Sequence, residues 1–185
     1  MTSTNQKELI RAAQDGDGQA FALLLEESYD TLYRFAYRWC GNRADAEDIT
    51  QQACMKLAQS INQFRFEAAF SSWLYRLVIN CAKDWYKSQN RHQHENIDDW
   101  IEPEPTADQT AENRIYLQQL LRLLDQMSDG FKETALLVHG EGLSHAEAAA
   151  ILQVKESTVS WRLHDIRKQL QLLQQQPDGS WELSL

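Results

Sequence analysis

Residues 141–170 read EGLSHAEAAAILQVKESTVSWRLHDIRKQL and predict two helices joined by a short turn. The first helix begins at Ser144, because Glu147 three residues later completes the pattern of a capping box. Three successive alanines at 148–150 keep this helix narrow, as close crossing by a second helix requires. Apolar residues at 151, 152 and 154 then fill the angle between the two helices. The stretch therefore predicts a helix-turn-helix.

The second helix, from about Glu156 or Ser157, has two different faces. Its apolar residues recur at helical spacing and predict an inward stripe of Val159, Leu163, Ile166 and Leu170. With Lys155 just before it, the opposite face offers Ser157, Thr158, Ser160, Trp161, Arg162, His164, Arg167 and Lys168. In helix-turn-helix proteins the start of the second helix contacts base edges while cations neutralise phosphates. Arg162 is the first candidate for a DNA contact, although a helical hairpin with a solvated polar face fits the same pattern.

Composition indicates a globular protein. The chain has 185 residues with 7 glycines and 3 prolines, which excludes fibrous and disordered classes. No apolar run approaches the roughly 20 residues of a membrane span, and the N-terminus lacks the pattern of a signal peptide. We therefore expect a cytoplasmic protein without direct membrane insertion. Cys40, Cys54 and Cys81 lack a CxxC spacing, which favours free buried thiols over a redox or metal role.

The net charge of -9 disagrees with nucleic-acid binding, because phosphate affinity comes mainly from Lys and Arg. The charge is unevenly distributed: residues 1–92 hold 11 basic and 11 acidic groups, and residues 93–112 hold none and 7. Residues 113–185 hold 7 basic and 9 acidic groups. Residues 61–92 carry 5 basic and 2 acidic groups, which predicts a local positive surface. We expect weak DNA binding by the free protein.

The helical pattern predicts an all-α fold of two small helical domains joined by an acidic linker, with the helix-turn-helix in the C-terminal domain. Residues 1–92 form the first domain of about four helices. Residues 93–112 lose periodicity and gather acidic residues and two prolines, which is typical of a linker. Residues 113–175 resume about four short helices. The tail 176–185 is polar, and fraying is favoured over a docking role.

Residues 44–58 predict a helix with one apolar and one acidic-polar face. Ile49, Ala53 and Leu57 are expected to face inward. The outer surface gathers Asp45, Glu47, Asp48, Gln51 and Gln52 near one end of the helix. Carboxylates in a first turn suit the positive end of the helix dipole. A solvated face and a docking surface for a basic partner both fit this pattern.

Residues 64–91 combine aromatic with basic side chains. The predicted core stripe is Leu74, Leu77, Val78, Cys81 and Trp85, and the polar face is Arg76, Asn80, Lys83 and Lys87. Trp73 and other aromatic residues alternate with these cations, as single-strand binding requires, where each stacked base contributes about 1–3 kcal/mol. Residues 64–72 break the helical period and predict a loop. Its Phe64, Phe66 and Phe70 either receive an unstacked base or plug the domain.

The order of these parts resembles the bacterial extracytoplasmic-function sigma factors of the sigma-70 family, over roughly residues 18–173. Residues 45–54 match the pattern DAEDLxQExF. The pattern WLxxxxxNxxxD is present as Trp73, Leu74, Asn80 and Asp84, and TVxxRLHxxRxxL as Thr158, Val159, Arg162, Leu163, His164, Arg167 and Leu170. The chain departs from the family at Gln52, Cys54, Ala58, Ser160, Trp161 and Asp165. Gln153 occupies a turn position often held by glycine, which costs about 1 kcal/mol where its φ is positive.

The resemblance implies that the residues on the outer surface of 44–58 bind core RNA polymerase, through its beta-prime and beta subunits. It also implies that loop 64–72 and the polar face of the following helix capture the melted minus-10 element. The helix-turn-helix would read the minus-35 element as duplex promoter DNA. An anti-sigma factor is a further partner that the resemblance implies, and no cofactor is expected.

Two other classes of function compete with this interpretation. A stand-alone helix-turn-helix regulator would bind duplex DNA without polymerase, and residues 45–58 and 64–91 would then serve packing alone. An enzyme is disfavoured, because the five histidines form no HExxH motif or nucleophile constellation. For the HxH pair His92 and His94, solvation is favoured over weak metal binding. No catalytic residue and no metal ligand is therefore predicted.

Overall fold

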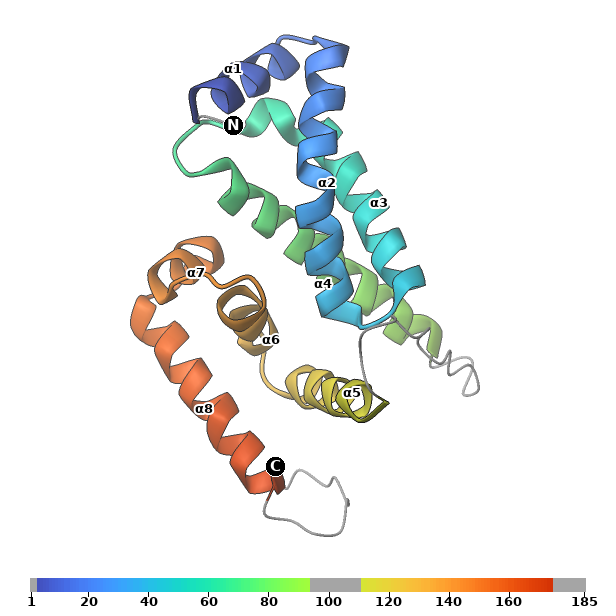
Figure 1. Cartoon of the computed structure of the whole chain (residues 1–185), viewed down its shortest axis with the longest axis vertical. Coiled ribbons are helices and arrows are strands. Elements are labelled where there is room, and N and C mark those ends of the chain that lie inside the picture. The colour runs from blue at the N-terminus through green and yellow to red at the C-terminus, as the bar shows by residue number, and fades with distance from the viewer. Residues whose placement is uncertain (1–2, 94–110, 175–185) are drawn as a thin grey trace. The chain divides into compact units, whose positions relative to one another are not determined.

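The computed structural model describes the backbone of residues 3–93 and 111–174, and the side-chain surroundings of residues 5–89 and 119–172. Every regular element in these ranges is a helix, which confirms the all-α class (Figure 1). The chain divides into two compact units between Arg122 and Leu123. Among the described residues, no helix is both long and apolar enough to cross a membrane.

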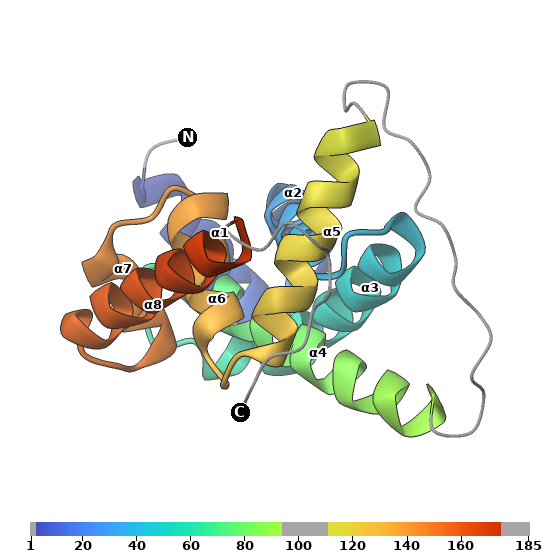
Figure 2. The same ribbon diagram turned by 90° about the horizontal axis from the view of Figure 1, so that it is seen from below.

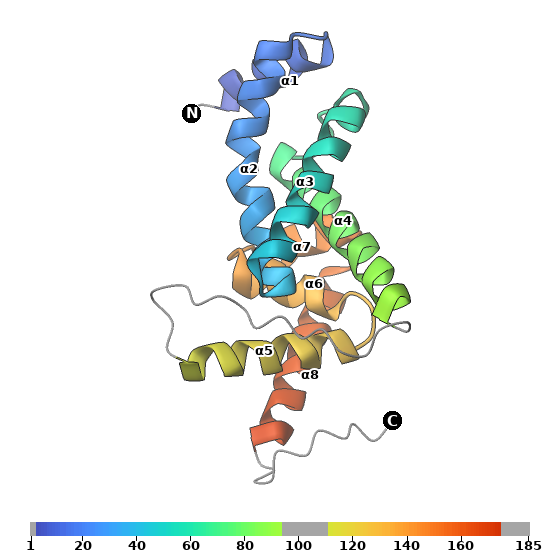
Figure 3. The same cartoon turned by 90° about the vertical axis from the view of Figure 1, so that its right-hand side faces the viewer.

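The first unit contains the expected helices. They are α1 (Ser3–Gln14), α2 (Gly18–Cys40), α3 (Arg43–Ser60), the 3-10 turn η1 (Ile61–Gln63) and α4 (Phe70–Gln93). Helix α1 packs on α2, while α2, α3 and α4 pack on one another (Figure 3). The end of α1 lies beside η1 (Figure 1). The chain therefore returns to its first helix just before the aromatic loop.

Capping interactions set the ends of α2 and the start of α3. The Asp17 carboxylate accepts hydrogen bonds from the backbone N–H groups of Gln19 and Ala20, at 2.9 and 3.1 Å. Such an N-cap is worth about 1 kcal/mol. Helix α2 ends at Gly41, whose φ of 77° is the left-handed conformation that glycine adopts without strain. Asn42 then begins α3 as its N-cap.

The core of the first unit consists of the inward stripes of α2, α3 and α4. Ile49, Ala53 and Leu57 are fully buried, as predicted. On α4 the residues predicted as core are buried, namely Leu74, Leu77, Val78 and Cys81. Trp85 lies only half-buried, because it stands beyond the part of α4 that is covered on that side. Each buried leucine or isoleucine contributes about 1.5–3 kcal/mol, so these stripes hold the helices together.

The three cysteines are free thiols, and the predicted burial is complete only for Cys81. Cys81 is buried, and Cys40 and Cys54 are half-buried. Burial raises the pKa of Cys81 to about 11 and also raises the pKa of Cys54. Because the thiolate is the reactive form of cysteine, the Cys81 thiol is unreactive near neutral pH.

Helix α5 (Ala111–Gln126) crosses the division between the units. The second unit continues with α6 (Phe131–Ala135), the π-helical turn η2 (Leu136–Gly140), α7 (His145–Leu152) and α8 (Glu156–Gln174). Helix α8 packs against α6 and α7 (Figure 2). The second domain was expected to begin at residue 113, whereas the division falls inside α5. Residues 94–110 of the expected linker and the tail 176–185 lie outside the described residues.

Candidate nucleic-acid and protein interfaces

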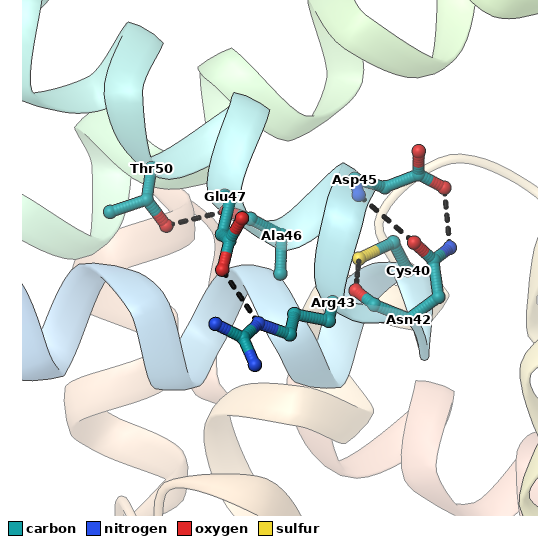
Figure 4. Close-up of polar contacts among 7 residues, drawn as sticks. All are labelled: Cys40, Asn42, Arg43, Asp45, Ala46, Glu47 and Thr50. Carbon is teal, nitrogen blue, oxygen red and sulfur yellow. Dashed lines mark hydrogen bonds and ion pairs between the residues drawn. The ribbon is translucent and has the colours of Figure 1, made fainter. Parts of the chain in front are cut away.

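The start of α3 is fixed by a reciprocal contact between Asn42 and Asp45 (Figure 4). The side-chain oxygen of Asn42 accepts from the backbone N–H of Asp45 at 2.9 Å, and its side-chain N–H donates to the Asp45 carboxylate. One turn later, Arg43 Nε lies 2.7 Å from Glu47 Oε1 in an exposed ion pair. Asp45 and Glu47 are therefore both engaged in local contacts at the first turn.

Beyond the first turn, the outer face of α3 is exposed. Asp48, Gln51 and Gln52 follow one another on this face, and Met55, 57% exposed, extends it. On the opposite face the Thr50 hydroxyl donates to the Ala46 carbonyl at 2.6 Å and is buried (Figure 4). The structure thus brings the five residues predicted to bind polymerase to one end of one helix. Met55 is an exposed apolar neighbour that was not predicted from the sequence.

An aromatic cluster forms where the chain enters α4. Ring centroids lie 4.9 Å apart for Phe64 and Phe66, 5.2 Å for Phe64 and Phe70, and 5.7 Å for Phe70 and Trp73. Phe64 and Phe70 are only 6% and 5% exposed, so they plug the domain. Phe66 remains half-buried, with a φ of 59°. The sequence left two roles open for the three phenylalanines, plugging the domain or receiving an unstacked base. Only Phe66 is exposed enough for the second role.

The loop is shorter than predicted. Residues 64–72 were expected to be irregular, but α4 begins at Phe70. The Trp73 N–H donates to the carbonyl of Ala69 at 3.2 Å and closes the first turn. Burial of Phe70 against Phe64 stabilises this early start, which the broken apolar period of the sequence did not indicate.

Helix α1 holds the loop from the other side. The Gln14 side-chain amide donates to the carbonyls of Ile61 and Phe64, at 2.9 and 2.8 Å. One turn earlier, the Arg11 guanidinium lies 5.4 Å from the centre of the Phe66 ring. Neither residue was predicted from the sequence. Their spacing of three, which places them on one face of a helix, was the only signal available.

The exposure of the side chains on the polar face of α4 varies along the helix. Asn80 and Lys87 are exposed, and Arg76 and Lys83 are half-buried. Asp84 lies beside them and pairs with Lys56 of α3, with 2.9 Å between Nζ and Oδ2. This hydrogen bond raises the pKa of Lys56. Asp84 therefore joins α4 to α3 within the polar surface.

In the second unit, the predicted capping box is confirmed. Ser144 Oγ accepts from the backbone N–H of Glu147 at 3.2 Å, and the Glu147 carboxylate accepts from the backbone N–H of Ser144 at 2.9 Å. Hydrogen bonds from Ser144 lower the pKa of Glu147. Helix α7 ends at Gln153, whose φ is 56°. A left-handed conformation costs a residue other than glycine about 1 kcal/mol. Gln153 therefore carries the cost that the sequence predicted for a positive φ at this position.

Helix α8 has an inward and an outward face close to those predicted. Val159, Leu163 and Ile166 are buried and Leu170 is half-buried. The exposed residues predicted for DNA are Lys155, Ser157, Ser160, Trp161, His164, Arg167 and Lys168, while Thr158 is half-buried. Ser160 Oγ lies 2.9 Å from Nδ1 of His145, which joins α8 to α7. Trp161 is 57% exposed, and its ring meets the Phe131 ring edge-on at 5.3 Å.

Arg162 departs most from the prediction, because it was expected on the outer face and its guanidinium contacts α6 instead. Its Nη1 donates to the carbonyl of Gly130 at 3.2 Å and to the hydroxyl of Thr134 at 3.3 Å. The guanidinium lies 5.9 Å from the centre of the Phe131 ring. These contacts turn the Arg162 side chain toward α6, and its position does not favour the expected DNA contact. Gly130 has a φ of 92°, and a Cβ there would lie 2.4 Å from the guanidinium carbon, so a side chain at this position would strain the backbone and displace Arg162.

Comparison with known proteins agrees with this arrangement. Residues 24–92 match the family "Sigma-70 region 2", and residues 117–170 match "Sigma-70, region 4". The ECF RNA polymerase sigma factor SigM of Mycobacterium tuberculosis is 32% identical over 88% of this chain and 81% of its own length. This chain is an ECF RNA polymerase sigma factor.

Two other relatives extend the comparison of this sigma factor. SigE of Mycolicibacterium smegmatis is 33% identical over 80% of this chain, which spans 58% of that longer relative. The sigma factor RpoE of Bartonella quintana, solved in complex with the anti-sigma factor NepR, is 23% identical over 85% of this chain and 98% of its own, with a TM-score of 0.63. That likeness supports the fold. The region 2 match begins within α2, so α1 lies outside it.

Proposed function

We propose that this sigma factor binds core RNA polymerase through its beta-prime and beta subunits and directs initiation at promoters with a minus-35 and a minus-10 element. The observation that carries the proposal is one chain that presents, in the family's order, an exposed acidic-polar helix face, an aromatic loop beside a basic helix, and a helix-turn-helix. The chain supplies specificity and no bond chemistry, and it acts in the cytoplasm without a cofactor.

The polymerase contact is assigned to the start of α3. Asp48, Gln51 and Gln52 are exposed and available to a basic partner, and Met55 adds apolar surface to them. Asp45 and Glu47 contribute negative charge while their local contacts fix the first turn. Charged rims of an interface steer association, and a buried apolar centre retains the partner. Docking therefore depends most on the exposed segment 48–55.

The minus-10 contact is assigned to the loop and the polar face of α4. Phe66 and Trp73 supply the aromatic surface that is not fully buried. Arg76, Lys83 and Lys87 supply cations, and Asn80 supplies an exposed amide. Phe64 and Phe70 support this surface from the core. Unpaired bases stack on aromatic rings while cations follow the backbone, which is the division of labour proposed here.

The minus-35 contact is assigned to the exposed face of α8. Ser157, Ser160 and Trp161 lie near the start of this helix, where such helices meet base edges, and Thr158 lies half-buried beside them. Lys155, His164, Arg167 and Lys168 supply phosphate contacts. Arg162 is assigned a positioning role, because it holds α8 to the start of α6. Two tethered domains can each bind weakly and still hold the promoter together.

An anti-sigma factor is proposed as a further partner, since the solved relative from Bartonella quintana is bound to one. Such a partner would compete with polymerase or DNA for the surfaces above. The alternative of a polymerase-independent regulator keeps only the helix-turn-helix for DNA. It predicts sequence-specific duplex binding by the pure protein without core enzyme.

The test is reconstituted transcription with purified protein, bacterial core polymerase and fragmented host DNA, followed by sequencing of transcript 5′ ends. We expect discrete start sites that share two upstream motifs. Asp48→Arg should abolish these starts and leave the fold intact, since it reverses charge on the exposed face of α3. The matched control Asp30→Arg reverses an exposed carboxylate on α2 and should transcribe normally. Core enzyme giving the same starts with and without the protein would refute the proposal.

A further inference from the structure

Helices α7 and α8 are joined by a hydrogen bond between two side chains of the helix-turn-helix. His145 is the first residue of α7, and its Nδ1 lies 2.9 Å from Oγ of Ser160 on α8. The Ser160 hydroxyl also donates to the backbone carbonyl of Glu156, one turn earlier, at 3.2 Å. The imidazole, the hydroxyl and the carbonyl therefore form one chain of contacts.

This chain of contacts determines which ring nitrogen of His145 donates. A serine hydroxyl has a single hydrogen, and the Glu156 carbonyl can only accept it. Both contacts of Ser160 exist together only if Nδ1 of His145 carries a hydrogen and donates it to Oγ. A protonated ring carries a hydrogen on both nitrogens, so the arrangement suits the charged form of the ring as well as one neutral tautomer. Nε2 is the ring nitrogen that the chain of contacts does not use.

Ser160 is exposed, but its hydroxyl is engaged within the protein. A base edge that approached this hydroxyl would have to displace the His145 ring or the Glu156 carbonyl from it. The half-buried imidazole of His145, held against α8, is therefore the group that the pair offers to a ligand.

The charges around this pair make the state of the ring matter. Glu147 of α7 and Glu156 of α8 are exposed and lie within four residues of His145 and Ser160 respectively. A neutral ring leaves these two carboxylates to repel a phosphate, whereas a protonated ring supplies a cation beside them. Further titratable or charged groups on the elements packed against α7 are His164 of α8, Lys132 and Glu133 of α6, and His139 of η2.

We propose that minus-35 binding by this sigma factor takes up a proton at His145, and that Ser160 is the positioning residue that holds the ring for this contact. The protonated ring donates from Nδ1 to Ser160 and from Nε2 to a phosphate of the minus-35 duplex. The first helix of a helix-turn-helix crosses the DNA backbone, which favours a phosphate over a base edge for a residue at the start of α7. The inference rests on the function proposed above, and it gives Ser160 a role within the protein rather than at a base.

The sign of the pH dependence follows from the proton that is taken up. Histidine side chains change charge between about pH 5 and 8. Because a phosphate accepts a hydrogen bond only from the charged ring, the complex retains a proton that the free protein loses as the pH rises. Promoter binding therefore weakens from pH 6 to pH 8. A neutral Nε2 that accepted a hydrogen bond from a base would give the opposite sign.

The experiment measures the affinity of the full-length protein bound to core polymerase for promoter DNA at pH 6 and pH 8 and constant ionic strength. The DNA carries the promoter found by transcript sequencing, and a control DNA has a scrambled minus-35 element. His145→Ala should bind the promoter about 10-fold more weakly than wild type at pH 6, the effect of one charge-assisted hydrogen bond, and less than about twofold more weakly at pH 8. At pH 6 the slope of log affinity against log salt should fall by about 0.9, the value of one phosphate contact. The scrambled DNA should show neither difference.

The coupling between the two residues tests the role of Ser160. Ser160→Ala should weaken promoter binding at pH 6, but it should add less than about twofold in the His145→Ala background, because a positioning residue acts through the ring that it holds. Ser160→Thr keeps the hydroxyl and should retain the wild-type pH dependence. His145→Lys is charged at both pH values and should lose the contribution of His145 to that dependence. The control His139→Ala removes an exposed histidine from η2 and should behave as wild type.

The outcomes separate this inference from the proposed function. If wild-type holoenzyme prefers the promoter over core enzyme alone, but His145→Ala changes affinity equally at both pH values, proton uptake is refuted and the sigma function stands. If the losses from Ser160→Ala and His145→Ala multiply, Ser160 contacts DNA itself and its positioning role is refuted. If wild-type holoenzyme binds the promoter no better than core enzyme, the proposed function fails and the proton-coupled contact fails with it.

Discussion

Phe66 and Gln153 are the two residues other than glycine that adopt a left-handed backbone in the described part of the chain, and they lie in the two regions assigned to DNA. Gln153 ends α7, and its exposed side chain makes no contribution to the turn beyond its backbone. Phe66 directs a ring against Phe64 and toward Arg11. The same left-handed strain therefore ends a helix at Gln153 and orients an aromatic side chain at Phe66.

The two regions also differ in how far their support lies along the sequence. The loop around Phe66 is pinned by Gln14, which is 50 residues from Phe64. The helix-turn-helix is supported by a capping box of two residues three apart and by the Arg162 contact to Gly130, 32 residues away within the same unit. Loss of a local support should destabilise the helix-turn-helix itself, whereas loss of Gln14 should affect what the loop binds.

The largest effect on the second region is expected from Gly130→Ala. The φ of 92° at Gly130 disfavours alanine. The new Cβ would lie 2.4 Å from the guanidinium carbon of Arg162, so the guanidinium would have to move away. We expect a loss of about 2–4 kcal/mol, from backbone strain and from the hydrogen bonds of a charged group. Hydrogen exchange of peptides from α6 to α8 in the full chain measures this loss of stability.

Gly142→Ala is the matched control for this substitution. Its φ of 71° is also positive, but nothing lies within 4 Å of the added Cβ. It should cost only the backbone strain, about 1–2 kcal/mol. Equal losses for the two substitutions would show that the Arg162 contact stabilises nothing.

Arg162→Ala should have a smaller effect on stability than Gly130→Ala, and Arg167→Ala is its matched control. Loss of the Arg162 contacts to Gly130 and Thr134 should cost about 1.5–3 kcal/mol of stability. Arg167 is exposed on α8, so its loss should leave stability within about 0.5 kcal/mol while weakening minus-35 duplex binding and its salt dependence. If Arg162→Ala instead weakened duplex binding without loss of stability, Arg162 would be the DNA contact first expected from the sequence.

The helices and their inward faces could be predicted, because helical periodicity and caps are local. Ile49, Ala53 and Leu57 are buried as the spacing indicated, and Ser144 forms the capping box. Arg162 was misplaced because its position borders the inward stripe, and a periodic pattern does not show which way a long side chain turns there. Its partner became identifiable only when α6 was placed against α8.

The aromatic loop could be predicted only in part. The sequence located three phenylalanines but could not decide which of them were core, because an irregular segment has no period from which burial follows. The contacts of Arg11 and Gln14 depend on how α1 folds back on residues 61–66, which no spacing along the chain specifies. Contacts of this range limit what a single sequence reveals about the site.

Replacement of each strained residue by glycine tests the comparison directly. Gln153→Gly should stabilise the second unit by about 1 kcal/mol and leave minus-35 binding unchanged, since only the backbone matters there. Phe66→Gly should relieve the same strain but remove the ring, so promoter opening should fall while polymerase affinity stays constant. Permanganate reactivity of minus-10 thymines measures opening. Normal opening by Phe66→Gly would mean that the Phe66 ring has no role in promoter opening.

The smallest effect concerns the pH dependence of the capping box. Because Ser144 lowers the pKa of Glu147 in the folded chain, the carboxylate stabilises the fold above its ordinary pKa near 4.5. That contribution is lost as the pH falls through the lowered folded value. Glu147→Gln should therefore be less stable than wild type at pH 6, and the difference should shrink as the pH falls below 4.5.

Urea unfolding of the full chain between pH 3 and 6, followed by the NMR methyl signal of Ile151 in α7, resolves this difference. Glu156→Gln is the control, because it removes an exposed carboxylate from the first turn of α8, where no capping box is formed with Ser144. A difference between Glu147→Gln and wild type that stayed constant down to pH 3 would assign the effect to side-chain shape rather than charge. The helix-turn-helix would then depend on the geometry of its cap alone, which would sharpen its contrast with the charged Arg11 contact at the loop.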